Sequence, residues 1–69
     1  MPFVNIRIVK EVIADDPVGK KTAMADKIVA AIAETAGIAK TDVWVVFEEV
    51  AASDWFVGDI SVHDRRQKP

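Results

Sequence analysis

The sequence predicts an α/β fold: a single β-α-β unit followed by a short C-terminal hairpin, in one domain over residues 1–69. Three observations lead to this fold class. Residues 3–9 have the β-branched content of a strand, residues 17–36 space their apolar side chains as a helix does, and residues 43–47 form an apolar strand. A strand, a helix of about twenty residues and a second strand are typical of a right-handed crossover between parallel strands. We therefore expect a parallel pair of strands covered by one helix.

The first strand runs over Phe3–Val9, and its side chains alternate between two faces. One face carries only branched apolar residues. The other mixes apolar and polar side chains, which favours a strand that lines an interface or a pocket. Arg7 interrupts this second face and is expected to pair with a carboxylate of another subunit or of a substrate. The first face holds Val4, Ile6 and Ile8, and the second holds Phe3, Asn5, Arg7 and Val9.

The helix is expected to begin at Pro17, because Asp16 is a good N-cap and proline is favoured at the first helical position. It is expected to end at Ala36, since Gly37 is a typical C-terminal stop. Gly19 weakens the first turn by about 1 kcal/mol relative to alanine. The apolar stripe of the helix comprises Met24, Ile28, Ala31, Ile32 and Thr35, widened by Ala25, Val29 and Ala33.

The second strand, Val43–Phe47, is apolar on both faces, as expected of a central strand in a covered sheet. The pattern breaks after Glu49, and Trp55–Ile60 then predicts a short hairpin or hooked segment. Between the first strand and the helix, Lys10–Asp16 has no regular period and is expected to be a loop. The tail Val62–Pro69 is basic and polar, and it carries no predicted element.

The apolar content of the chain predicts assembly. Hydrophobic residues make up 51% of only 69 residues, and there is no cysteine for a disulfide or a thiolate metal site. A domain of this size buries roughly 60% of its surface, and small scaffolds usually need oligomerisation or a staple. A pair of strands covered by one helix also leaves its second face bare. Both observations predict an obligate oligomer.

Charge and hydropathy argue against several classes of protein. The net charge is −2, from 9 basic and 11 acidic residues, which argues against binding to nucleic acid. No apolar run approaches the ~20 residues of a membrane span, and the N-terminus lacks the features of a secretory signal. We therefore expect a cytoplasmic protein that binds neither nucleic acid nor membrane.

Acid–base chemistry is offered only by the N-terminus. There is no glycine-rich phosphate loop or zinc-protease motif, and His63 alone cannot build a zinc site. Glu48 and Glu49 should point to opposite faces of a strand, so they cannot act as a pair. If Met1 is removed, Pro2 becomes a secondary amine, and an apolar pocket would lower its pKa towards the range of a general base. If Met1 stays, Pro2 is an amide and an ordinary strand start. Aromatic side chains that could supply the pocket are Trp44, Phe47, Trp55 and Phe56.

The order of these segments resembles the 4-oxalocrotonate tautomerase family over nearly the whole chain. The likeness is carried by the start Pro2–Ile6, the β-α-β unit and the segment Trp55–Gly58, and the tail after Ser61 is similar to that of one subgroup. The resemblance implies a tautomerase/MIF-like fold and a homohexamer built as a trimer of dimers. It also implies that Pro2 transfers a proton of an enol or 2-keto acid without a cofactor or metal, and that Trp55 forms part of the pocket wall.

The sequence departs from the family at its two substrate-binding arginines, which fall at or near Val12 and at Trp44. A dicarboxylate substrate would still need a cation to pair with. Trp44 is either an altered pocket wall, which would favour a more apolar or monocarboxylate substrate, or an interface residue. The candidate replacement cations are Lys10, Lys40, and Arg65 or Arg66 from a neighbouring subunit.

Three functions stay open from the sequence. The first is a tautomerase that uses Pro2 as its acid and base. The second keeps the scaffold but uses the proline for hydratase or dehalogenase chemistry, and the third is a non-catalytic oligomeric scaffold or small-molecule binder. The absent arginines favour the second and third, whereas Pro2 and the aromatic segment favour the first.

Overall fold

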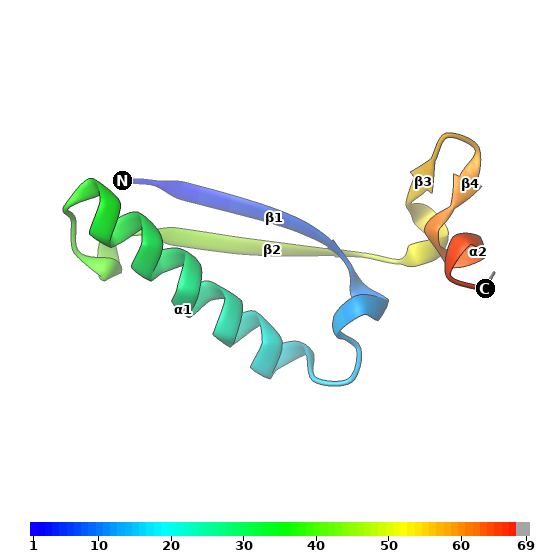
Figure 1. The fold of residues 1–69 in the computed structure, drawn as a ribbon, viewed down its shortest axis with the longest axis horizontal. Helices are drawn as coiled ribbons and strands as arrows, with labels where there is room; N and C mark the ends of the chain where they lie inside the picture. Colours follow the sequence, from blue (N-terminus) through cyan, green and yellow to red (C-terminus); the bar gives the residue numbers. More distant parts are fainter. Residues whose placement is uncertain (68–69) are drawn as a thin grey trace.

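The computed structural model describes residues 1–67 and contains two small sheets and two helices. A parallel pair of strands, β1 and β2, carries the long helix α1, while an antiparallel pair, β3 and β4, and the short helix α2 lie beyond one end of it (Figure 1). The predicted α/β fold, with one β-α-β unit and a C-terminal hairpin, is confirmed. In chain order the elements are β1 (Phe3–Val9), the 3₁₀ helix η1 (Lys10–Ile13), α1 (Pro17–Ala36), the 3₁₀ helix η2 (Lys40–Asp42), β2 (Trp44–Val50), the 3₁₀ helix η3 (Ala52–Asp54), β3 (Phe56–Val57), β4 (Ile60–Ser61) and α2 (Val62–Gln67).

The parallel pairing of β1 and β2 sets the frame of the molecule. Phe3 lies opposite Trp44 at the start of the ladder, and Val9 lies opposite Val50 at its end. Before the first pair, the Trp44 N–H donates to the carbonyl oxygen of Pro2 at 3.0 Å. β2 continues past its predicted end because pairing with β1 extends through the two glutamates, whose polar side chains had ended the local apolar pattern.

Both predicted ends of α1 are confirmed. Asp16 is the N-cap, and its Oδ1 accepts a hydrogen bond from the Gly19 N–H at 3.1 Å, while Pro17 occupies the first turn. A side chain at position 19 would collide with the Asp16 carboxylate, which explains the glycine there. At the other end Gly37 is left-handed, with φ 70°, and its N–H donates to the Ala33 carbonyl at 2.9 Å.

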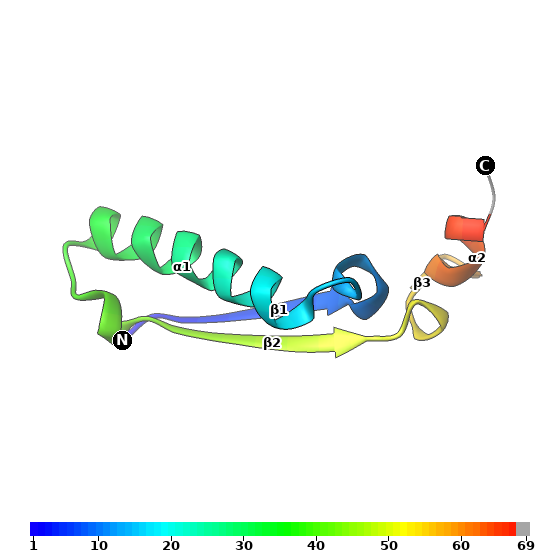
Figure 2. The same cartoon turned by 90° about the horizontal axis from the view of Figure 1, so that it is seen from below.

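Helix α1 covers one face of the sheet and leaves the other face bare (Figure 2). Ala33 is buried, and Ala25 and Val29 on the same line of the helix are half-buried. Two residues of the predicted stripe, Ala31 and Thr35, are instead exposed, because each lies about 200° around the helix from Ala33. The predicted stripe was therefore wrong at these two positions.

Two segments without a predicted element contain short helices. In the predicted loop, η1 buries Ile13, whose exposed fraction is 3%. In the predicted tail, Ser61 Oγ accepts a hydrogen bond from the Asp64 N–H at 3.1 Å and caps α2. The hairpin is confirmed, with β3 antiparallel to β4 and Gly58 left-handed at φ 68°. Residues 68–69 of the predicted tail lie outside the described residues.

A single copy of the chain has no closed core. Its radius of gyration is 15.0 Å, against roughly 11 Å for a compact domain of this length. The buried apolar residues in the described part of the chain are Ile13, Ala33, Val43 and Ala52. Two apolar surfaces are open instead: the bare face of the sheet and the C-terminal arm, which we define as residues 51–67. The large exposed side chains on these surfaces are Phe3, Trp44, Val46, Phe56, Val57 and Ile60.

Candidate active site

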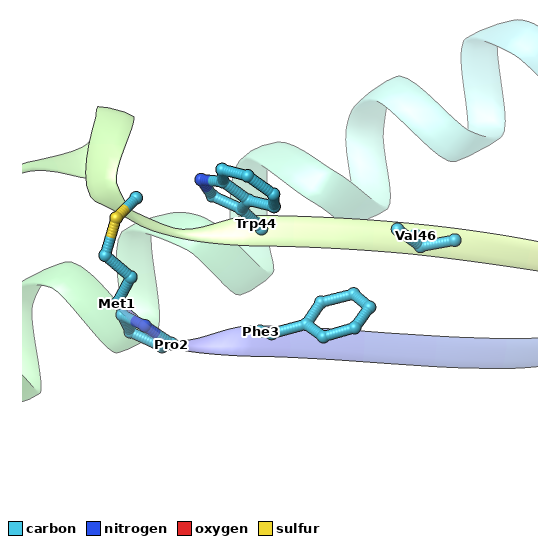
Figure 3. Close-up of a pocket in the computed structure, with 5 residues that line it drawn as sticks. All are labelled: Met1, Pro2, Phe3, Trp44 and Val46. Carbon is cyan, nitrogen blue, oxygen red and sulfur yellow. The ribbon is translucent and has the colours of Figure 1, made fainter.

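Pro2 lies in an apolar hollow of about 470 Å³ at the N-terminal end of β1, on the bare face of the sheet (Figure 3). Phe3 and Trp44 are cross-strand partners on this face, and Val46 follows Trp44 at the spacing of two that keeps strand residues on one face. Met1 completes the lining. The site thus combines Pro2, the residue just before β1, with hydrocarbon and aromatic walls.

A backbone hydrogen bond next to the β1–β2 ladder holds the carbonyl group of Pro2 in place. Its oxygen accepts the Trp44 N–H, and proline, which directly precedes β1, has no N–H to leave unpaired. With Met1 attached the Pro2 nitrogen is an amide and has no basic lone pair. A basic amine at this place therefore requires the removal of Met1.

A polar cluster follows the hollow along the same face of the sheet. Asn5 Nδ2 donates to Glu48 Oε1 at 2.6 Å, and Arg7 Nη2 lies 3.6 Å from Glu48 Oε2. The expected partner of Arg7 in another subunit or in a substrate is thus replaced by a carboxylate of the same chain, because Arg7 and Glu48 are opposite each other in the register. Glu49 points to the opposite face, as predicted, and pairs with Lys21 of α1 at 2.9 Å.

The other candidate site residues divide between the two ends of the sheet. Trp44 lines the hollow with Pro2, and Lys40 lies in η2, just before β2 at the same end. Lys10 follows the last residue of β1, and Trp55 follows η3, both at the opposite end (Figure 1). A seven-residue strand at about 3.3 Å per residue places these ends about 20 Å apart. One chain therefore brings together Pro2 and Trp44, but not Lys10 or Trp55.

The remaining candidate cations, Arg65 and Arg66, lie on α2 in the C-terminal arm. Ion pairs in residues 1–67 involve Arg7, Lys20 and Lys21, and none of the four candidate cations takes part in one.

Sequence reasoning missed two walls of the hollow, Phe3 and Val46. The signal was present: a parallel register that starts at the two strand beginnings puts Phe3 beside Trp44, and alternation then adds Val46. Neither residue type carries chemistry by itself, so a search for reactive groups passed over them.

Two further properties of residues 1–67 bear on the class of site. They contain no group of three or more histidine or acidic side chains placed to hold a metal ion. None of their helices is long and apolar enough to cross a membrane.

Comparison with known proteins identifies the class. A family model described as "Tautomerase enzyme" matches residues 2–65. The chain is 32% identical over 68 residues to "Probable tautomerase K2" of Dickeya dadantii (strain 3937), covering 99% of this chain and 97% of that protein. These two matches cover nearly the whole chain, so the protein is a member of the tautomerase family, and family membership supports an isomerase-type enzyme.

Two solved structures are similar to this chain over nearly its whole length. The crystal structure of DmpI from Helicobacter pylori matches with a TM-score of 0.84 and 26% identity, covering 99% of this chain and all (100%) of that one. One of the 4-oxalocrotonate tautomerase isozymes from Methylibium petroleiphilum matches with a TM-score of 0.78 and 25% identity, over 93% of this chain and 97% of that one. The chain belongs to the 4-oxalocrotonate tautomerase family.

Proposed function

We propose that, once Met1 has been removed, the secondary amine of Pro2 is the general acid and base of a tautomerase. The observation that carries the proposal is the place of Pro2 at a strand end, in a hollow with apolar walls. Apolar surroundings disfavour the ammonium form of an amine and lower its pKa. An amine whose pKa lies near neutral pH can both accept and release a proton.

In the proposed reaction the neutral amine takes the proton from the hydroxyl group of an enol acid. The oxygen then forms the carbonyl, and the electron pair of the carbon–carbon double bond takes a proton from the prolyl ammonium. The amine is neutral again at the end, so the cycle needs no cofactor.

The hollow favours a substrate with an apolar body and one carboxylate. Phe3, Trp44 and Val46 offer no positive charge to a second carboxylate. Lys40, in the segment that leads into β2, is the cation of this chain proposed to pair with the single carboxylate. Lys10 is a cation that only another copy could supply.

We further propose a homohexamer built as a trimer of dimers. Support comes from the open sheet face and from the exposed C-terminal arm, which a single copy cannot cover. A second copy is also needed to bring Trp55 or Lys10 to Pro2, since about 20 Å of strand separates them within one chain.

The test is an enol–keto assay on phenylenolpyruvate and on 2-hydroxymuconate, with Pro2→Ala as the variant and intact mass as the check on Met1. We expect Pro2→Ala to lose on the order of 100-fold or more in kcat/KM, the usual contribution of a positioned acid–base group. The monocarboxylate should be the better substrate.

Equal rates for the wild type and Pro2→Ala would refute the tautomerase proposal, and so would full retention of Met1 in the native protein. Trp44, standing where the family has an arginine, favours one second candidate: hydration or dehalogenation of an unsaturated acid by the same proline. Turnover of such an acid, lost in Pro2→Ala and without enol ketonisation, would select that candidate.

A further inference from the structure

We propose that Glu11 is a positioning residue of the site: its carboxylate fixes the direction in which the C-terminal arm leaves the sheet, and thereby places Trp55. The proposal rests on the proposed function, in which Trp55 of one copy lines the Pro2 hollow of another. It begins from a hydrogen bond between two segments that are far apart in sequence.

Glu11 caps the first turn of the arm from outside it. Its Oε1 accepts a hydrogen bond from the backbone N–H of Ala52 at 2.9 Å. η3 begins at Ala52, and its own N-cap residue, Ala51, has no side-chain oxygen to offer. Ala52 is 1% exposed, the smallest fraction among the buried residues, so water cannot easily replace this acceptor.

The carboxylate of Glu11 is held in its ionised form. The hydrogen bond from Ala52 lowers the pKa of Glu11 below its ordinary value of 4.5, and the charges of Lys10 and Arg66 lower it further, while burial opposes them. Hydrogen bonds to an ionised acceptor are shorter and stronger than neutral ones. The contact that geometry supports is the hydrogen bond to Ala52, so Glu11 acts on the first turn of the arm.

Trp55 follows Ala52 as part of one unit. The Trp55 N–H donates to the Ala52 carbonyl at 3.4 Å, and the Val62 N–H donates to the Trp55 carbonyl at 2.7 Å. The backbone of Trp55 is thus tied to η3 on one side and to the start of α2 on the other.

The hydrogen bond that the Ala52 N–H donates to Glu11 is the attachment that sets this unit against the sheet. Within residues 1–67 it is the only hydrogen bond or ion pair between the arm and the rest of the chain. Without it, only the covalent link after β2 and van der Waals packing direct the arm. A misplacement of about 1 Å at a catalytic centre can lower the rate on the order of 100-fold.

The experiment compares Glu11→Ala with Glu11→Gln, whose amide oxygen can still accept the Ala52 N–H. Glu34→Ala, an exposed glutamate of α1, is the matched control. Three quantities are measured: kcat and KM on phenylenolpyruvate, hydrogen exchange of the Ala52 amide, and the emission of Trp55 in a Trp44→Phe background.

We expect Glu11→Ala to lower kcat at least tenfold with a smaller change in KM, to speed exchange at Ala52 and to shift the Trp55 emission. Glu11→Gln should restore most of all three, and the control should change none. If Glu11→Ala does not fold, Glu11→Asp takes its place, because its shorter side chain cannot reach Ala52. Unchanged exchange at Ala52 and unchanged kcat in these variants would overturn the proposal.

Failure of this proposal can be told apart from failure of the proposed function. If Pro2→Ala is as active as the wild type, the tautomerase proposal fails, while exchange at Ala52 and the emission of Trp55 still report on Glu11. If Pro2→Ala is inactive and Trp55→Ala keeps full activity, the proline function stands and the positioning role of Glu11 is refuted.

Discussion

The β-α-β body, residues 3–50, and the C-terminal arm are held together in different ways. The body has a seven-residue ladder, a helix capped at both ends, and an ion pair from Lys21 to Glu49 at 2.9 Å. The arm has two-residue strands and a six-residue helix, and it leaves Phe56 57% and Val57 51% exposed. An isolated two-stranded hairpin is marginally stable in water. The body is therefore held in shape by its own ladder, caps and ion pair even though one face of its sheet is bare, whereas the arm has few such contacts of its own.

The largest expected effect comes from a charge placed on the arm. Phe56→Asp should abolish assembly, because burial of a phenylalanine contributes about 1.5–3 kcal/mol and a carboxylate resists burial. Sedimentation at micromolar concentration would show smaller species. Val18→Asp is the matched control, since Val18 is 76% exposed on α1 of the body, and it should assemble normally. If Phe56→Asp assembles as the wild type does, the arm does not form the contact between copies, and the proposed difference between body and arm is wrong.

Removal of either helix cap should have a smaller effect, and it tests whether the body and the arm unfold independently. Asp16→Ala removes the cap of α1 and should cost about 1 kcal/mol in the free energy of unfolding, measured with urea. Ser61→Ala removes the cap of α2, and its effect should appear as faster hydrogen exchange at the Asp64 amide while the exchange of α1 is unchanged. Faster hydrogen exchange in both helices together after either change would mean that body and arm are one cooperative unit.

The smallest expected effect is a pH dependence of the body. The hydrogen bond from Lys20 Nζ to Asp15 Oδ1, 2.6 Å long, holds the pKa of Asp15 below its ordinary value of 3.8. A lowered native pKa stabilises the fold above the unfolded value, and this contribution is lost as the pH falls below 3.8 through the native value. Asp15→Asn should therefore lower the urea midpoint slightly at pH 7 and flatten its fall in acid. The effect is small because the side chain of Asp15 is 72% exposed.

The body could be predicted from the sequence because its signals are local. Asp16, Pro17 and Gly37 fix the ends of α1 through hydrogen bonds within one turn. α2 carries the same kind of signal, a serine three residues before an aspartate. It was not predicted as a helix because the residues that follow are basic and polar. The tilt of the stripe on α1 was missed because only packing against the sheet decides which apolar line is buried.

The candidate site could be predicted only in part, for a different reason. Pro2 and Trp44 follow from the parallel order of the strands, which brings both strand beginnings to one end. In the proposed assembly the surroundings of Lys10 and Trp55 would depend on how copies meet, and that information is spread over exposed side chains such as Phe56 and Ile60. The hydrogen bond between the Ala52 N–H and Glu11 joins residues 41 positions apart, so no local sequence pattern predicts it.

The hydrogen bond from Trp44 to the Pro2 carbonyl has one more consequence. It anchors Pro2 by its carbonyl oxygen, which removal of Met1 would leave untouched, and proline has no N–H that the ladder could lose. Removal of Met1 therefore converts the Pro2 nitrogen from an amide into an amine without breaking any backbone hydrogen bond of β1. The uncleaved and cleaved chains should share one fold and differ only in the chemistry of a single nitrogen. In the proposed maturation the chemistry of one nitrogen changes while the fold does not, and the uncleaved chain is a structurally matched control for every assay of the cleaved one.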